Sequence, residues 1–251
     1  MGCKDTILFL SYKYILTFSR ILVSLSISIY MAFFSQDYLS FFQELAANNN
    51  KDWFDVNRKR YEKNVKTPFS AFTQHMIGKI SALDPSFTDL LSKDCVFRIN
   101  RDIRFSKDKT PYKQMCSAVI APNGKKSKSI DGVYFEMTPE HFRVYGGIYE
   151  MEKDDVLSVR EGIAQNLSEF EALITEPKFT ALFGDIHGAK NKIISPELRA
   201  PAQIQELIFN KQWYFYTSFP ASTILEDNLD ELLFDAFMIG RPLQQFFNQF
   251  I

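Results

Sequence analysis

The sequence predicts an α+β fold, with a central antiparallel sheet flanked by helices from both ends of the chain. Apolar residues recur at helical spacing near the two ends, whereas the middle of the chain alternates between apolar and polar residues. Short turns join the alternating segments, which favours antiparallel pairing because parallel strands need long crossovers. We expect the sheet to contain about residues 95–149 together with 212–219.

Three helices are expected before the sheet. The first covers about residues 36–47 and ends at the polar run 48–50. The second begins around Asp52. Thr67-Pro68 predicts an N-cap followed by a helix-opening proline, so a third helix should start there and end at Asp84-Pro85.

The strands are expected in the middle of the chain and once more near its end. They are Val96–Ile99, Met115–Ala121, Gly132–Thr138, His141–Tyr149 and Trp213–Phe219. In Gly132–Thr138, Val133 and Phe135 should point to one face of the sheet, and Tyr134 and Glu136 to the other. Gly146-Gly147 lacks side chains, so either a bulge or a close approach of backbone or ligand is expected there.

Helices are expected to resume after the sheet. They are Lys153–Asn166, Ser168–Thr175, Gln203–Phe209 and Asn228–Ile251. The last of them should break at Gly240-Arg241-Pro242, because proline lacks the amide hydrogen that a helix interior requires.

Residues 7–34 are strongly apolar, but Lys13 and Arg20 interrupt them. The longest uncharged run, Ile21 to Phe34, has 14 residues, whereas a membrane-spanning helix needs about 20. Three interpretations remain open: a membrane anchor, a signal peptide without a clear cleavage site, or a non-native extension ahead of a start at Met31. The third is favoured, because the sequence from Met31 reads as the beginning of a domain. Residues 1–30 are then an extension, residues 31–251 form a single domain, and the location is cytoplasmic; anchoring through the apolar segment is the alternative.

The composition limits the classes of function. A formal net charge of −1 gives no overall attraction to nucleic acid or to anionic membranes. The three cysteines have no metal-binding or redox spacing, which favours a reducing compartment. No P-loop, Rossmann or G-x-S-x-G motif is present, so the sequence identifies neither a cofactor nor a reaction.

One short window carries an unusual density of charge. Its cations are Arg98, Arg101, Arg104, Lys107, Lys109 and Lys113, and its anions are Asp102 and Asp108. Six minus two leaves a local surplus of four positive charges. Arginine binds phosphate or carboxylate in a bidentate manner, so the window indicates an anion site. The candidate ligand-binding residues are Arg98, Arg101, Asp102, Arg104, Asp108, Lys109 and Tyr112.

The residues leave three hypotheses open. The first is a pocket that binds a small molecule carrying phosphate or carboxylate. The second is a metal-dependent phosphoester or nucleic-acid hydrolase, in which Asp131 and Glu136 join Asp102 or Asp108. The third is an interaction module whose charges form a structural ion network. Nucleic acid is a candidate partner that the net charge does not indicate, and a membrane is one only if residues 7–34 are an anchor.

The charged window also resembles the hallmark of a mainly bacterial family of uncharacterised proteins, a domain of unknown function. At the spacing of this chain the hallmark is R-x-x-R-D-x-R-F-x-x-[DN]-K-x-x-Y. It is filled here by Arg98, Arg101, Asp102, Arg104, Phe105, Asp108, Lys109 and Tyr112. The resemblance spans about residues 34–250 and extends to NNNKDWFDVNRKRY. At 145–149, where family members are expected to have Gly-Gly-Gly and a tryptophan, this chain has Tyr-Gly-Gly-Ile-Tyr. The resemblance implies one domain and no particular activity.

Overall fold

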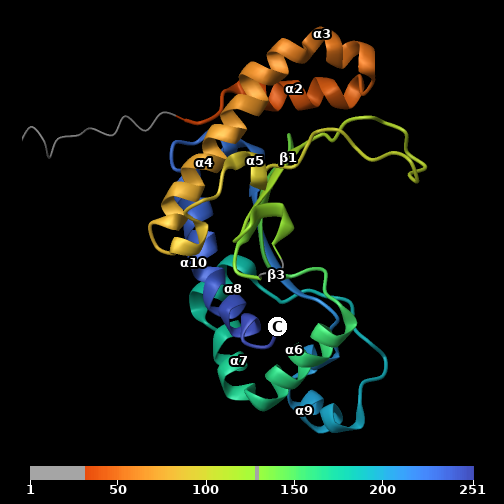
Figure 1. Cartoon of the computed structure of the whole chain (residues 1–251), viewed down its shortest axis with the longest axis vertical. Coiled ribbons are helices and arrows are strands. Elements are labelled where there is room, and N and C mark those ends of the chain that lie inside the picture. Colours follow the sequence, from red (N-terminus) through yellow and green to blue (C-terminus); the bar gives the residue numbers. More distant parts are fainter. Residues whose placement is uncertain (1–31, 128–129) are drawn as a thin grey trace, which may run out of the picture. The chain divides into compact units, whose positions relative to one another are not determined.

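The computed structural model describes residues 32–127 and 130–251 (Figure 1). The expectations for residues 1–30, for a start at Met31 and for Lys128 lie outside the described residues. Across these two described ranges, no helix combines the length and the apolar content that crossing a bilayer requires.

The centre of the domain is a four-stranded antiparallel sheet in which the strand order follows the chain. Its strands are β1 (Cys116–Ile120), β2 (Val133–Met137), β3 (His141–Ile148) and β4 (Trp213–Pro220). In β2 burial alternates as expected, with Val133 and Phe135 buried and Tyr134 and Glu136 half-buried. The predicted α+β class and central antiparallel sheet are therefore confirmed.

The helices before the sheet are α2 (Gln36–Ala47), α3 (Lys51–Tyr61) and α4 (Thr67–Ser81). The predicted N-cap at Thr67 is wrong, because Thr67 has helical backbone angles and a π-helical turn over 62–66 joins α3 to α4. In that turn the Thr67 amide donates to the carbonyl of Glu62, five residues earlier. The wider turn leaves room for the ring of Pro68, which would clash with an ordinary α-helical ladder.

Helices cover one face of the sheet. Phe135 of β2 contacts Phe69 and Phe72 of α4, with ring centroids 5.5 and 5.7 Å apart. Phe215 of β4 lies 4.7 Å from the ring of Phe183 in α8 (Pro177–Phe183), a helix that the sequence did not predict. Figure 1 shows α4 and α10 on this side of the sheet. The contacts form one aromatic core between helices and sheet.

Five α-helices lie in the part of the chain after β3, together with β4. The helices are α6 (Lys153–Gln165), α7 (Leu167–Ile174), α8, α9 (Arg199–Ile204) and α10 (Leu229–Asn248). The predicted break at Gly240-Arg241-Pro242 is wrong, because α10 runs through it without interruption. Pro242 has no amide hydrogen to donate to the carbonyl of Met238, four residues earlier. Both residues are exposed, so water can bind that carbonyl instead. Packing of the buried side of α10 against the core stabilises the helix on both sides of Pro242.

Residues 96–115, here called the arm, extend from the sheet as an irregular hairpin (Figure 1). The expected strand at Val96–Ile99 is not regular; its ladder is reduced to isolated bridges, Val96 with Ala118 and Asn100 with Tyr112. Beyond these bridges, the charged side chains of the arm pair with one another, Arg101 with Asp108 and Arg104 with Asp102. A short helix, α5 (Ser92–Cys95), precedes the arm.

The face of the sheet opposite α4 and α10 is here called the open face. Its side chains come from alternate positions of β2, β3 and β4, and most of them are half-buried. They include Tyr134, Glu136, His141, Arg143, Tyr145, Tyr214 and Tyr216. The open face is therefore rich in aromatic and charged groups, unlike the apolar face that packs on the helices.

Candidate functional site

The candidate residues of the arm mostly bind one another. The guanidinium of Arg101 donates to Asp108 Oδ2 at 2.5 Å and to the hydroxyl and carbonyl oxygens of Thr110. Arg104 makes a two-pronged contact with Asp102, with Nε–Oδ1 2.9 Å and Nη2–Oδ2 2.6 Å. These pairs make the arm an ion-paired structure, and two of its cations are already matched by carboxylates.

The carboxylates of the arm are held in the charged form. Hydrogen bonds from the amide and hydroxyl of Thr110, followed by the contact with Arg101, lower the pKa of Asp108 to about 2. Arg104 lowers the pKa of Asp102 by side-chain and backbone hydrogen bonds. Lys109 Nζ donates to the carbonyl of Ile103 at 2.9 Å, so this lysine also ties the arm to itself.

Tyr112 lies at the base of the arm, and its ring packs into the core. It is 6% exposed and stacks on Phe54 of α3, with centroids 4.0 Å apart and planes inclined by 16°. The side chain of Asn49 donates to the Tyr112 carbonyl at 2.9 Å and accepts from its amide at 3.1 Å. Tyr112 therefore joins the arm to the N-terminal helices.

The carboxylates of the metal hypothesis lie apart. Asp131 Oδ2 is 3.3 Å from Arg241 Nη2, and Glu136 lies on the open face. Asp102 and Asp108 pair within the arm. Among residues 32–127 and 130–251, no group of three or more histidine, cysteine or acidic side chains is arranged to hold a metal ion.

The open face contains a hollow of about 690 Å³, here called the tyrosine hollow. Its lining includes Tyr134, Tyr145, Tyr149, Tyr214, Tyr216, Glu136, Arg143 and the backbone of Gly146 and Gly147. Gly147 has a left-handed φ of +82°, and a Cβ there would lie 2.2 Å from the carbonyl oxygen of Trp213. A Cβ on Gly146 would lie 2.6 Å from the ring of Phe215. A side chain at either position would therefore clash, at Gly147 with the backbone of β4 and at Gly146 with the core ring of Phe215.

Tyrosine rings form a row across the sheet. Tyr134, Tyr145 and Tyr216 are direct register partners on β2, β3 and β4. The ring centroids of Tyr145 and Tyr216 are 5.3 Å apart in a stacked arrangement, and those of Tyr134 and Tyr145 are 5.5 Å apart. Phe97 of the arm extends the row, with its centroid 6.1 Å from that of Tyr134. These four residues are here called the ring row.

A polar row lies beside the ring row. Glu136, Arg143 and Ser218 are register partners on successive strands. The hydroxyls of Tyr134 and Tyr145 donate to the Glu136 carboxylate at 3.2 and 3.1 Å. His141 Nε2 lies 3.2 Å from the same carboxylate. Glu136 thereby fixes the two rings and the imidazole on the surface of the sheet.

Burial keeps both of these tyrosines protonated over a wide pH range. It raises the pKa of Tyr134 to about 12 and also raises the pKa of Tyr145. The hydroxyls therefore remain donors to Glu136 at neutral pH.

Cations stand at both ends of the ring row. The guanidinium carbon of Arg143 lies 5.8 Å from the ring centroid of Tyr216, and Lys113 Nζ lies 5.4 Å from that of Phe97. Arg143 is 37% exposed, and its contacts are long, 3.8 Å to Glu136 and 3.3 Å to Ser218. Arg98 is exposed, and within the described part of the chain it has no hydrogen-bonding or ion-pair partner. These three cations lie beside the ring row, where each could contact an added anion.

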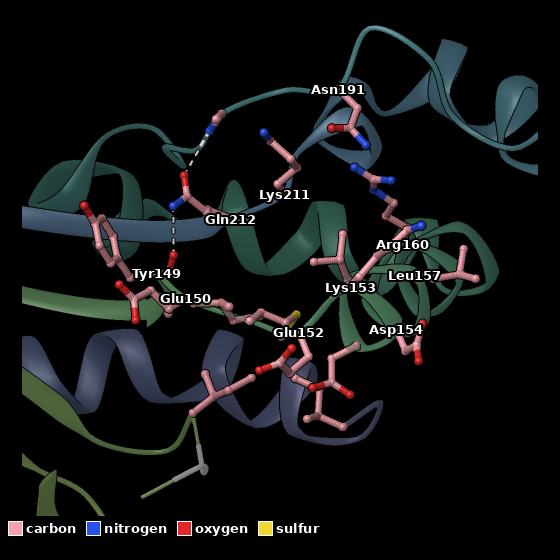
Figure 2. Close-up of a pocket in the computed structure, with 18 of the residues that line it drawn as sticks. Tyr149, Glu150, Glu152, Lys153, Asp154, Leu157, Arg160, Asn191, Lys211 and Gln212 are labelled. Carbon is pink, nitrogen blue, oxygen red and sulfur yellow. Dashed lines mark hydrogen bonds between the residues drawn. The ribbon is translucent and has the colours of Figure 1, made fainter. Parts of the chain in front are cut away.

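A second hollow of about 1090 Å³ adjoins the first and shares Ile130, Gly147 and Tyr149 with it. Figure 2 shows Gln212 bracing its wall, where the side chain donates to the Tyr149 carbonyl at 2.8 Å. Its charges are mixed in sign: Glu150, Glu152, Asp154 and Asp155 against Lys153, Arg160 and Lys211. The guanidinium of Arg160 is engaged by the carbonyls of Phe209 and Asn210. The second hollow thus lacks a concentration of one charge.

Sequence reasoning missed the open face as a site. It placed Tyr134 and Glu136 on one side of their strand but did not connect them with Arg143, Tyr145 and Tyr216. The sequence does show aromatic and charged residues at alternate positions of the strands. Only the strand register reveals that they lie next to one another on the sheet.

The chain was compared with protein families. A family model described as "Conserved hypothetical protein (DUF2461)" matches residues 37–246, a range that includes the arm and the whole sheet. The chain belongs to this family. No curated protein and no solved structure matches it. The description of DUF2461 names no activity.

Proposed function

We propose that this DUF2461 domain binds a ligand that combines a planar ring with a phosphate or carboxylate group. The ring stacks on the tyrosines of the open face, and the anion contacts Arg143 at one end of the ring row or Lys113 and Arg98 at the other. The proposal keeps an anion-binding role for the charged window but moves the binding surface from the arm itself to the open face and the base of the arm.

The observation that carries the proposal is the gathering of half-buried tyrosine rings around one hollow, beside Gly146 and Gly147. Ligand sites are mostly concave and aromatic, with a few well-placed polar groups. Glu136 holds Tyr134 and Tyr145 by their hydroxyls, so the rings are ordered before a ligand arrives. Such preorganisation lowers the entropic cost of binding.

The available cations favour an anionic ligand. Arg60 in the N-terminal helices serves as a comparison for Arg143. Its guanidinium is paired with two carboxylates, Asp37 and Glu44, each within 3.0 Å. Arg143 lies 3.8 Å from the nearest oxygen of Glu136 and is 37% exposed, so it is not held by a short ion pair as Arg60 is and can contact a phosphate or a carboxylate. The negative charge of Glu136 is offset by two hydroxyl donors and His141, which reduces its repulsion of an anion.

A reducing compartment such as the cytoplasm fits the proposal. The two cysteines in the described residues, Cys95 and Cys116, are free and buried. Both side chains pack in the core as reduced thiols.

The proposal is tested by isothermal titration calorimetry with AMP, dTMP, their nucleosides, inorganic phosphate and benzoate. We expect the ring-bearing anions to bind more tightly than either the nucleosides or phosphate alone. Tyr216→Ala should weaken binding by about 1–3 kcal/mol, the usual contribution of base stacking on an aromatic side chain. Arg143→Ala should weaken the nucleotides and benzoate but not the nucleosides.

Two control variants complete the test. Phe105→Ala removes a ring that is 95% exposed at the tip of the arm, and Arg199→Ala removes an exposed arginine of α9. Both should bind like the unchanged protein. Failure of every ring-bearing anion to bind, or equal losses in the controls, would refute the proposal.

A further inference from the structure

We infer that the ligand of the open face is a single-stranded nucleic acid, which runs along the ring row and onto the base of the arm. The inference rests on the proposed function and deepens it, because it names a polymer where the proposal needs only one ring and one anion.

The first argument is the repetition of rings. Phe97, Tyr134, Tyr145 and Tyr216 follow one another with centroids 5.3–6.1 Å apart. A mononucleotide has one base and can stack on one or two of these rings. A strand presents successive bases and can use the whole row. Surfaces that bind single strands combine such stacking rings with a positively charged track for the backbone.

The second argument is the placement of the cations. Arg143 lies over Tyr216 at the β4 end of the ring row, and Lys113 lies over Phe97 at the arm end. One phosphate cannot contact both ends, whereas successive phosphates of a strand can. Arg98 is close enough to Lys113 to contribute to lowering the pKa of that lysine, after the larger effect of burial. An anion between these two cations would relieve their mutual repulsion.

Ion pairs tie the arm to itself, and its base is fixed to the N-terminal helices. Arg101 with Asp108, and Arg104 with Asp102, tie the arm to itself. Tyr112 and Asn49 anchor its base to the N-terminal helices. These hallmark residues then act as positioning residues that hold Phe97, Arg98 and Lys113 beside the sheet. This gives the ion network a role without requiring that its members touch the ligand.

The same features disfavour other polymers. A duplex hides the faces of its bases, so the ring row would have nothing to stack on. An acidic peptide would satisfy the cations but not the rings. The favoured ligand therefore has unpaired bases joined by phosphates.

The test measures binding of a fluorescently labelled oligothymidylate of ten nucleotides by fluorescence anisotropy. Unlabelled dTMP, a DNA hairpin duplex and a polyglutamate peptide are then added as competitors. We expect the oligothymidylate to bind at least tenfold more tightly than dTMP. The logarithm of its association constant should fall with the logarithm of salt concentration with a slope of about −2, since each phosphate contact of a single strand contributes about −0.7. The duplex and polyglutamate should compete at least tenfold more weakly than unlabelled oligothymidylate.

Variants at the arm separate this inference from the proposed function. Arg98→Ala changes an exposed side chain. It should weaken the oligothymidylate several-fold and dTMP much less, because a single phosphate can still contact Arg143 at the other end of the ring row; Arg199→Ala should change neither. Equal affinities for the oligothymidylate and dTMP would overturn the inference and leave the proposed function standing. Equal competition by the duplex or by polyglutamate would also overturn it. If neither nucleotide nor oligonucleotide binds, both claims fail.

Discussion

Tyr112 provides the sharpest test of how the hallmark residues work. The structure places its ring in the core, stacked on Phe54, although the sequence places it among the candidate ligand-binding residues. Tyr112→Ala would leave a cavity at the junction of the arm and α3. It would also loosen the backbone that Asn49 holds on both its amide and its carbonyl.

The expected cost follows from the burial of the ring. Replacing a buried aromatic residue by alanine usually lowers the free energy of unfolding by about 3–5 kcal/mol. The stacked pair accounts for about 0.5–1.5 kcal/mol of this. Tyr112→Phe should cost less than about 1 kcal/mol, because within the described residues the hydroxyl has no hydrogen-bonding partner.

The assay is urea unfolding followed by circular dichroism, with Tyr216→Ala as the matched control on the open face. That control should remain within about 1 kcal/mol of the unchanged protein, because its ring is only half-buried. The reasoning is refuted if Tyr112→Ala is as stable as the control. It is also refuted if Tyr112→Phe keeps its stability and loses nucleotide binding, since the hydroxyl would then contact the ligand.

Other predictions concern the core and the hollow. Burial raises the pKa of the Cys95 and Cys116 thiols to about 11 and about 12, so a thiol reagent should label them only as the protein unfolds. The unfolded chain loses these protons near pH 9 and the folded chain retains them, so stability should fall as pH rises from 9 towards 12, as pH-dependent urea titrations can measure. Gly147→Ala should destabilise the protein by more than about 1 kcal/mol in thermal unfolding, because of its positive φ and the clash with Trp213. Gly78→Ala should instead stabilise it by about 0.5–1 kcal/mol in the same scans, because it lies within α4 with no atom near the added methyl group.

Local patterns predicted most of the fold. Alternation at Val133, Tyr134 and Phe135 located β2 correctly, because one face of that strand is buried by helices and the other is not. Two of the errors came from proline. At Pro68 and Pro242 a local rule predicted a boundary, but a π-helical turn and the packing of α10 carry the helix through. Whether tertiary packing overrides a local preference cannot be read from the neighbouring residues alone.

The candidate site was harder to predict. The charge of the arm was visible, but the pairing of Arg101 with Asp108 depends on how the hairpin folds back. The open face depends on register, because Tyr134, Tyr145 and Tyr216 become neighbours only when three strands align. A shift of one residue would turn one of these rings to the opposite face of the sheet.

The central claim is that the tyrosines of the open face bind the ligand. It is tested most directly by nuclear magnetic resonance of protein with 13C-labelled tyrosine rings during titration with dTMP. The account predicts that the ring signals of Tyr134, Tyr145 and Tyr216 shift together and saturate, while those of the buried Tyr38 and Tyr112 stay in place. Unchanged open-face signals at saturating dTMP, or shifts confined to the arm, would contradict it.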